Sequence, residues 1–229
     1  MERGLYIAAS GMLAEMARQD QLANDLANAS TPGYKADRVS QQAFGDLLLT
    51  NTATGATIGK LGSGSAIDKQ VTDFRQQALR TTEQPLDLAI QGEGFFAVKT
   101  ADGVRYTRDG SFVADAKGNL VDKLGNQVLG VGNKPIAVDA DGKIDTSKVG
   151  VFALKTAVKQ GDSNFTGTAS GTATGQVRSG ALEGSGVDPA RAMIDLMASM
   201  RAMEATQRAI TTIDSTLQQT ASQVGNLPG

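Results

Sequence analysis

The chain has 229 residues, no cysteine and no histidine, with 40% hydrophobic residues, 4% aromatic residues and a formal net charge of −2. This length holds one large domain or two small ones, and the acidic balance argues against nucleic-acid binding, which needs a basic surface. The absence of cysteine and histidine excludes disulfides and thiol chemistry and removes the commonest general base and metal ligand, so we expect no metal and no cofactor.

The first predicted element is an N-terminal helical segment over residues 1–35. Its apolar residues recur at spacings of three and four, which indicates one apolar face. That face contains Leu5, Ala9, Met12, Met16, Leu22, Ala23 and Leu26. Turn-forming residues over 28–35 should end the helix near Asn28. Glu2 and Glu15 are unlike a signal peptide, and no segment has the roughly 20 apolar residues of a membrane span, so we expect neither.

Residues 36–73 have the weakest pattern in the chain. A short apolar patch (Phe44, Leu47, Leu48 and Leu49) precedes a stretch over 50–65 that is rich in Thr, Gly and Ser. A segment of this composition cannot bury enough apolar surface to form a core of its own. We therefore interpret 36–73 as an extended, mobile arm or as a loop that a partner orders.

Short apolar runs alternate with turn signals from about residue 74 to residue 154. The turns are expected at Asp102-Gly103, Asp109-Gly110, Lys117-Gly118-Asn119 and Asp141-Gly142. Because Asp-Gly and Gly-Asn pairs favour hairpins, the pattern predicts a compact antiparallel β domain within 74–188. Residues 160–185, rich in Gly, Ser and Thr, should return the chain to its last element.

The last element is a helix over 189–229. Asp188 is a good N-cap, Pro189 suits the first helical position, and Gly225, Asn226 and Pro228 should stop the helix. Its length is ~50 Å at 1.5 Å per residue, which calls for a partner along its side. One apolar row contains Leu196, Met203, Ile210, Leu217 and Val224, and a second row contains Met193, Met200 and Ala221 with polar Gln207 and Asp214. We expect the two terminal helices to pair; the alternative is that one row faces solvent.

Two local motifs resemble ligand sites. Gly92-Glu93-Gly94 with Ala97 fits a dinucleotide fingerprint, but a strand follows where that site needs a helix, so we predict a strand-to-strand turn. Residues 139–145 hint at a calcium loop. Aligning Gly142 with the turn glycine of that loop places Ala137 and Lys148 at ligand positions, which favours a simple β-turn.

Several motifs together resemble one protein family. They lie in the first helix, in the turn after it, in the β domain and before the last helix. The residues are Gly4-Leu5-Tyr6, Ala8-Ala9-Ser10-Gly11-Met12, Leu22 to Asn28, Thr31-Pro32-Gly33-Tyr34-Lys35, Gln91 to Phe96, Tyr106 to Phe112, Leu120 to Gly130, Ser179 to Ser185, and Val187-Asp188. The chain is identified as a member of the bacterial flagellar rod and hook axial family, with proximal and distal rod types both open.

This resemblance implies an α+β fold. The N- and C-terminal helices would form an antiparallel coiled-coil core, and the central antiparallel all-β domain would face outward. The implied domains are the helical segment 1–35, the arm 36–73, the β domain 74–188 and the helix 189–229. The implied function is a structural rod subunit that polymerises through its terminal helices into a helical drive shaft between motor and hook.

The resemblance also implies partners and a location. The partners are copies of itself, other rod and hook axial proteins, the flagellar type III export apparatus and the bushing ring proteins. The location is the flagellar basal body, outside the cytoplasmic membrane in the periplasm and cell-wall layer, after export without a cleaved signal peptide. We expect the terminal segments of the free subunit to be largely disordered, since each apolar face lacks a complete partner.

The expected site residues follow from the apolar faces and the family turn. No catalytic, cofactor or metal residue is assigned. The expected subunit interface contains Leu5, Met12, Met16, Leu22, Leu26, Met193, Leu196, Met200, Met203, Ile210, Leu217 and Val224; the family turn motif contains Asn28, Thr31, Pro32, Gly33 and Tyr34.

Two other classes of function compete with this assignment. One is a secreted cell-wall glycan hydrolase using carboxylates such as Asp87 with Glu93 or Asp109 with Asp115, although Trp, the usual sugar platform, is absent. The other is a secreted coiled-coil adhesin or translocator. It would share the helical ends but need not carry the motifs of the β domain.

Overall fold

The structure is a computed structural model that describes residues 2–43, 47–50, 57–61, 64–139, 141–161 and 163–225. The chain divides into two compact units, each built from separate stretches of sequence. The helical unit comprises Met1–Leu26, Asp37–Val71 and Pro189–Gly229, and the β unit comprises Ala27–Ala36 and Thr72–Asp188. The β unit therefore includes a short N-terminal segment, residues 27–36, which the sequence places directly after a helix.

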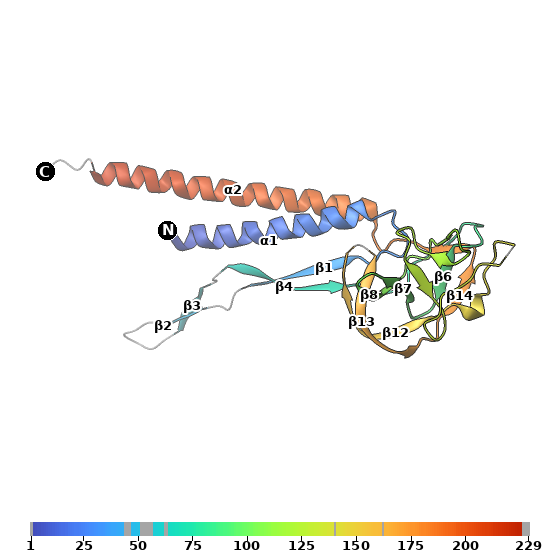
Figure 1. Cartoon of the computed structure of the whole chain (residues 1–229). Helices are drawn as coiled ribbons and strands as arrows, with labels where there is room; N and C mark the ends of the chain where they lie inside the picture. The colour runs from blue at the N-terminus through green and yellow to red at the C-terminus, as the bar shows by residue number, and fades with distance from the viewer. Residues whose placement is uncertain are drawn as a thin grey trace. The chain divides into compact units, whose positions relative to one another are not determined.

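Two long helices dominate the helical unit, drawn in blue and in orange to red in Figure 1. α1 spans Glu2–Ala27 and α2 spans Pro189–Gly225, which is 37 residues. The predicted start of α2 is confirmed, because proline at the first helical position lacks only an amide that would have no partner there. The expected stop signals Asn226 and Pro228 lie outside the described residues.

Strands form in the region where the sequence showed no strand pattern. β1 (Asp37–Ala43) pairs with β4 (Ser65–Thr72), and β2 (Leu47–Thr50) pairs antiparallel with β3 (Thr57–Leu61). Strand pairing uses backbone groups, so the polar sequence of β1 does not prevent it. Phe44 and residues 51–56 and 62–63 of the predicted arm lie outside the described residues.

The β unit is built on antiparallel strands. They are β5 (Leu79–Thr81), β6 (Leu88–Gln91), β7 (Phe96–Thr100), β8 (Gly103–Thr107), β9 (Val113–Ala114), β10 (Leu120–Val121), β11 (Gln127–Leu129), β12 (Phe152–Lys159), β13 (Asn164–Thr172), β14 (Gln176–Ser179) and β15 (Ala181–Glu183), with a 3-10 helix at Thr146–Lys148. A seven-stranded sheet has the order β12-β13-β8-β7-β11-β10-β9, while β14 pairs with β6 and β15 pairs with β5. The predicted α+β class with a central antiparallel β domain is confirmed.

The two faces of the seven-stranded sheet carry separate apolar clusters. Phe96 and Val98 of β7 belong to the larger cluster, and Phe95 and Ala97 belong to the smaller one. This alternation follows from the strand geometry, which points successive side chains to opposite faces. The larger cluster contains Leu88, Ile90, Phe96, Val98, Phe112, Leu120, Val128, Ile136, Val149 and Val151.

The predicted turn at Asp109-Gly110 is not a hairpin, because β8 and β9 do not pair and the Gly110 carbonyl accepts the Leu88 amide at 3.0 Å. Other glycine turns of the β unit lie where the sequence predicted them. Gly103 and Gly118 have positive φ angles of 123° and 79°, and they join β7 to β8 and β9 to β10. Gly92 and Gly94 join β6 to β7, so the strand-to-strand turn is confirmed over the dinucleotide fingerprint. Gly142 has a φ of 70° and donates its amide to the Asp139 carbonyl at 2.9 Å, which confirms the β-turn.

The prediction for residues 160–185 was incomplete. This Gly-, Ser- and Thr-rich stretch forms β13, β14 and β15 instead of a simple return of the chain. Threonine favours strands, and β14 lies in register with β6 from Gln176 opposite Gln91 to Ser179 opposite Leu88. Ala137 makes an isolated bridge with Asn119 and belongs to no strand.

Candidate functional site

The helical unit brings the two terminal helices into contact. The Ser199 hydroxyl donates to the Glu15 carboxylate, and the Gln19 amide donates to the Met203 sulfur at 3.6 Å. At the other end of α1, a methyl group added at Gly4 would lie 3.5 Å from Cδ1 of Ile213. Gly4, at the start of α1, lies near Ile213, whereas Glu15, further along α1, contacts the earlier Ser199 of α2. The helices therefore run antiparallel (Figure 1).

One face of α2 is covered along most of the helix. Its least exposed residues alternate at spacings of four and three, as expected for a helix packed along one side. They are Ala192, Leu196, Ser199, Met203, Thr206, Ile210, Ile213 and Leu217, all buried or half-buried. The row that begins at Leu196 is therefore the one that the sequence predicted.

The second predicted row of α2 is not covered. Met193 and Met200 are 50% and 52% exposed, and Gln207 and Asp214 are exposed as well. The covered partner row lies one residue earlier, at Ala192, Ser199, Thr206 and Ile213. The sequence missed this row because the hydroxyl residues Ser199 and Thr206 interrupt its apolar residues. The polar residues that seemed to interrupt the seam face solvent instead.

Both helices expose a stripe of large apolar side chains. The α1 stripe consists of Tyr6, Ile7, Leu13 and Met16, and the α2 stripe consists of Met193, Ile194, Met197 and Met200. Leu13 is 67% exposed and Ile194 is 62% exposed. Large apolar side chains exposed together on one helix mark interaction sites more often than scattered single residues do.

The predicted interface residues divide between covered and exposed positions. Leu5, Met12, Leu22 and Leu26 of α1 are half-buried, as are Leu196, Met203, Ile210 and Leu217 of α2. Met16, Met193 and Met200 belong to the exposed stripes. The side chain of Val224 lies outside the described residues. Tyr6, Ile7, Leu13, Ile194 and Met197 were missed because they lie off the predicted heptad rows.

The family turn motif is folded into the β unit. The Thr31 amide donates to the Asn28 carbonyl at 3.1 Å, and the Tyr34 amide donates to the Thr31 carbonyl at 3.3 Å. Pro32 lies within this turn, half-buried. Gly33 has a φ of +66°, and a Cβ atom there would overlap the Arg108 carbonyl. Position 33 therefore requires glycine both for its backbone angle and for its close approach to the backbone of Arg108.

Next to this turn lies a buried cluster of three charged side chains. Nζ of Lys35 is 2.7 Å from the Glu183 carboxylate, and Nη1 of Arg108 is 3.1 Å from its other oxygen. The side chains of Lys35, Glu183 and Arg108 are 0%, 1% and 4% exposed. Lys35 also donates to the Arg75 carbonyl at 2.7 Å, and Arg108 donates to the Gly92 carbonyl at 2.8 Å.

Burial shifts the acid–base equilibria of this cluster. It lowers the pKa of Lys35 from its ordinary value of 10.5, and the Glu183 carboxylate opposes the shift. Burial also lowers the pKa of Arg108, again against the effect of Glu183. One carboxylate thus holds two buried cations, and its removal would leave both without a counter-charge.

Tyr34 is enclosed by the same region. Its side chain is 0% exposed, and Nζ of Lys159 lies 3.9 Å from the centre of its ring. Lys159 also donates to the Lys35 carbonyl at 2.9 Å. The Tyr34 carbonyl accepts the Gly186 amide at 2.8 Å. The turn after α1 and the segment before α2 are therefore bonded directly inside the β unit.

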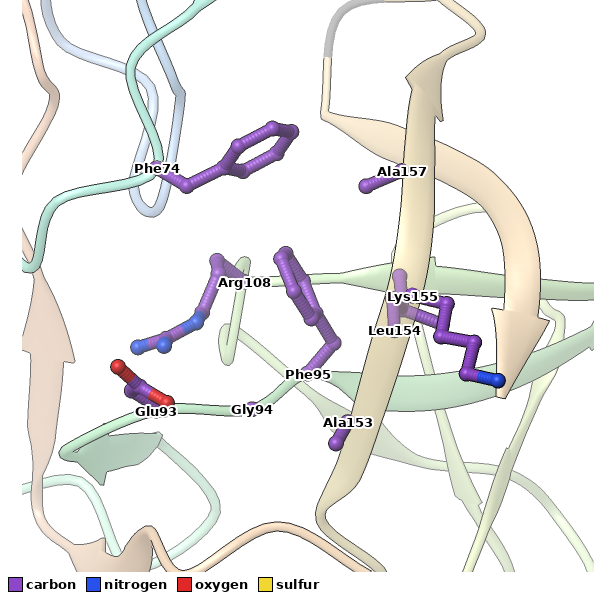
Figure 2. A pocket seen from close by; sticks show the side chains of 9 residues that line it. All are labelled: Phe74, Glu93, Gly94, Phe95, Arg108, Ala153, Leu154, Lys155 and Ala157. Carbon is purple, nitrogen blue, oxygen red and sulfur yellow. The ribbon is translucent and has the colours of Figure 1, made fainter. Parts of the chain in front are cut away.

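Arg108 also lines a pocket of about 280 Å³ (Figure 2). Phe74, Phe95, Leu154 and Lys155 line it, and Glu93 contributes the one carboxylate among its lining residues. Glycoside hydrolysis normally needs two carboxylates flanking one bond. The pocket therefore lacks the arrangement that the hydrolase alternative requires.

The other acidic residues considered for catalysis stabilise turns. Asp109 accepts the Ser111 amide at 2.9 Å, and Asp115 accepts the amides of Lys117 and Asn119 at 2.8 and 2.7 Å. Within the described ranges, no group of three Asp, Glu, His or Cys residues is placed to hold a metal ion. No helix in the described part of the chain is long and apolar enough to cross a membrane.

Comparison with known proteins decides the family. Residues 5–35 match the family model "Flagella basal body rod protein", residues 89–155 match "Flagellar hook protein FlgE/F/G D1 domain", and residues 178–224 match "Flagellar basal body rod FlgEFG protein C-terminal". The chain is 33% identical to the flagellar basal-body rod protein FlgG of Bacillus subtilis strain 168, over 96% of this chain and 98% of that protein. The chain belongs to the flagellar basal-body rod and hook family.

Two further relatives show how far the similarity extends. The rod protein FlgF of Caulobacter vibrioides is 32% identical over 99% of this chain and 98% of its own length. The hook protein FlgE of Brucella abortus is 41% identical, but over 54% of this chain and 30% of its own length. The full-length match to rod proteins makes this chain a structural subunit of the flagellar basal-body rod. No comparison favours a hydrolase or an adhesin.

Proposed function

We propose that this rod subunit polymerises through its terminal helices into a helical tube that links the motor to the hook, without catalysis. The observation that carries the proposal is the pair of exposed apolar stripes on α1 and α2. Burying one large apolar side chain contributes about 1.5–3 kcal/mol, so each stripe favours contact with another surface. The family membership supports other axial proteins as that surface.

The chemistry of the stripes favours contact between unlike surfaces. The α1 stripe contains an aromatic and two branched residues, whereas the α2 stripe contains three methionines, which adapt to irregular partners. A contact between two different surfaces of identical subunits repeats without closing and generates a filament. We propose the covered rows as an antiparallel coiled-coil core and the stripes as contacts between neighbouring subunits.

The interface that we propose includes both classes of position. Leu5, Met12, Leu22, Leu26, Leu196, Met203, Ile210, Leu217 and Val224 would hold the helix pair, and Met16, Met193 and Met200 would contact neighbouring copies. In the free subunit, the terminal segments would be largely disordered, because the helix pair alone leaves half of its apolar residues in water. Strong amide protection across residues 5–26 of the isolated monomer would contradict this point.

The remaining partners and the location are also proposals. They are export through the flagellar type III apparatus without signal cleavage, contact with the bushing ring proteins, and a position outside the cytoplasmic membrane. The domain division 1–35, 36–73, 74–188 and 189–229 stands as a functional proposal, in which the helices build the tube and the β domain faces outward.

The experiment compares two equally exposed apolar residues in polymerisation of the purified chain. Leu13→Ser removes part of the α1 stripe, and Val158→Ser changes a residue of β12 that is 63% exposed. We expect Leu13→Ser to raise the critical concentration about tenfold or more, since 1.4 kcal/mol corresponds to a factor of ten. Val158→Ser should leave it unchanged.

Sedimentation and electron microscopy provide the measurement. Equal effects of Leu13→Ser and Val158→Ser would refute the stripe as an assembly surface. The hydrolase alternative predicts release of soluble fragments from peptidoglycan by the purified chain, and the structural proposal predicts none.

A further inference from the structure

The segments next to the two helices bind each other inside the β unit. The Ser185 hydroxyl donates to the Asn28 carbonyl at 2.9 Å, directly after the last residue of α1. The Gly33 amide donates to the Glu183 carbonyl at 2.9 Å, and the Gly186 amide donates to the Tyr34 carbonyl at 2.8 Å. We call residues 27–36 and 181–188 together the root clamp.

The root clamp is anchored by the best-buried groups of the chain. Tyr34, Lys35 and Glu183 are among its largest fully buried side chains. The Lys35–Glu183 ion pair joins the two segments, and Arg108 of the β unit binds the same carboxylate. The clamp therefore depends on the β unit's own packing and needs no contact made by the helices.

Ser185 also bonds to the backbone directly after α1. The Asn28 carbonyl, directly after α1, accepts both the Ser185 hydroxyl at 2.9 Å and the Thr31 amide at 3.1 Å. The Ser185 hydroxyl oxygen in turn accepts the Val187 amide at 3.3 Å, close to the start of α2. One side chain thus binds the backbone next to both helices.

Helix propensity falls along both helices with distance from the root clamp. The first half of α2, 189–205, is rich in Ala, Met, Leu and Arg, which are strong helix formers. Its second half contains Thr211, Thr212, Ser215, Thr216 and Thr220, whose hydroxyls bond back to carbonyls three or four residues earlier. In α1 both glycines, Gly4 and Gly11, lie in the half away from the clamp. Such residues lower helix stability.

We propose that the root clamp holds the end of α1 and the start of α2 together in the unassembled subunit, so that helix order begins there and spreads toward the chain termini on assembly. The first turn of a helix is its costly step, and a fixed end reduces that cost. Holding two segments together also raises their effective concentration for pairing. This inference rests on the proposed disorder of the free termini.

The test is amide hydrogen exchange on the full-length monomer. We expect residues 12–27 and 189–205 to exchange at least about tenfold more slowly than residues 2–11 and 206–225. Ser185→Ala should speed exchange in the first pair of segments about fivefold, which is the effect of losing one hydrogen bond. A flat profile, or the reverse gradient, would overturn the root clamp.

The matched control is Ser179→Ala. Ser179 donates to the Pro85 carbonyl at 2.8 Å elsewhere in the β unit, so its loss should leave helix exchange unchanged. Equal acceleration by both variants would overturn the inference. The near-ultraviolet signal of buried Tyr34 and Tyr106 reports whether the β unit stays folded.

The hydrogen-exchange experiment and the polymerisation experiment can fail independently of each other. If the wild-type chain polymerises but its monomer shows a flat exchange profile, the root clamp is wrong and polymerisation stands. If the gradient is present but no polymer forms under any condition, polymerisation is wrong and the root clamp stands.

Discussion

The β unit and the helical unit differ in how far their apolar side chains are buried. Among the described residues, Ala14 and Ala192 are the only hydrophobic residues of the helical unit that are buried, whereas the β unit buries two clusters of large side chains. The helical unit instead exposes Tyr6, Leu13 and Ile194 to more than 60%. On the proposed assembly, the helical unit would gain stability by contact with other copies, whereas the β unit already buries its apolar clusters.

Buried charges occur in both units. The β unit buries Lys35, Arg108 and Glu183 as one cluster of ion pairs, which requires an already fixed arrangement of strands. The helical unit buries Asp25 and Asp37, and between α1 and α2 the Ser199 hydroxyl donates to the Glu15 carboxylate.

Removing the Glu183 carboxylate should have the largest effect on the β unit. Glu183→Ala leaves Lys35 and Arg108 buried without a counter-charge, and we expect a loss of about 3–5 kcal/mol in the free energy of unfolding. Urea denaturation, followed by the near-ultraviolet signal of the tyrosines, measures it. The exposed Asp102, which pairs with Arg105, serves as control, and Asp102→Ala should cost less than about 1 kcal/mol. Similar losses of unfolding free energy in the two variants would show that the buried charge cluster stabilises the β unit no more than an exposed charge does.

A matched pair of glycines tests the close approach at the family turn. Gly33→Ala adds backbone strain of ~1–2 kcal/mol and an overlap with Arg108 of ~1–3 kcal/mol. Gly118 has a φ of +79° with nothing within 4 Å of an added Cβ, so Gly118→Ala carries only the strain. Urea unfolding of both variants separates the two effects. Equal losses would exclude the overlap.

Acid should weaken the β unit through its turn aspartates. Hydrogen bonds from Asn119 lower the pKa of Asp115 below its ordinary 3.8, and those from Ser147 lower the pKa of Asp145. A carboxyl with a lowered folded pKa stabilises the protein above pH 3.8, and this contribution disappears as the pH falls through the folded value. Unfolding free energy measured between pH 5 and 2 should therefore fall less steeply in Asp115→Asn. An unchanged slope would contradict the assignment.

The smallest expected effect is that of a helix substitution on the β unit. Ile210→Ala trims the covered face of α2, yet the β unit draws none of its core from that helix. We expect its unfolding free energy to change by less than about 0.5 kcal/mol, as for substitutions at independent sites. The same variant should weaken polymerisation. A clear loss in the tyrosine-detected transition would show that the two units unfold together.

Several features could be predicted from residues alone because their causes are local. Pro189 starts α2, the glycines at 103, 118 and 142 turn the chain, and the heptad row from Leu196 to Leu217 marks a covered helix face. Each depends on backbone preference or on spacing within one element. The motifs of the first helix and the turn likewise identified the family that the comparisons show.

Other features depend on which distant segments meet. Nothing near Lys35 in the sequence indicates that its amine is buried against Glu183, or that position 33 must leave room for Arg108. Within residues 160–185, β13 pairs with β8, β14 with β6 and β15 with β5, all distant in sequence, and the second covered row of α2 includes the polar residues Ser199 and Thr206. Periodicity and turn chemistry therefore determined the elements and the family. The pairing of charges, of strand edges and of helix faces was decided only by tertiary structure, because long-range contacts select among partners that look alike in sequence.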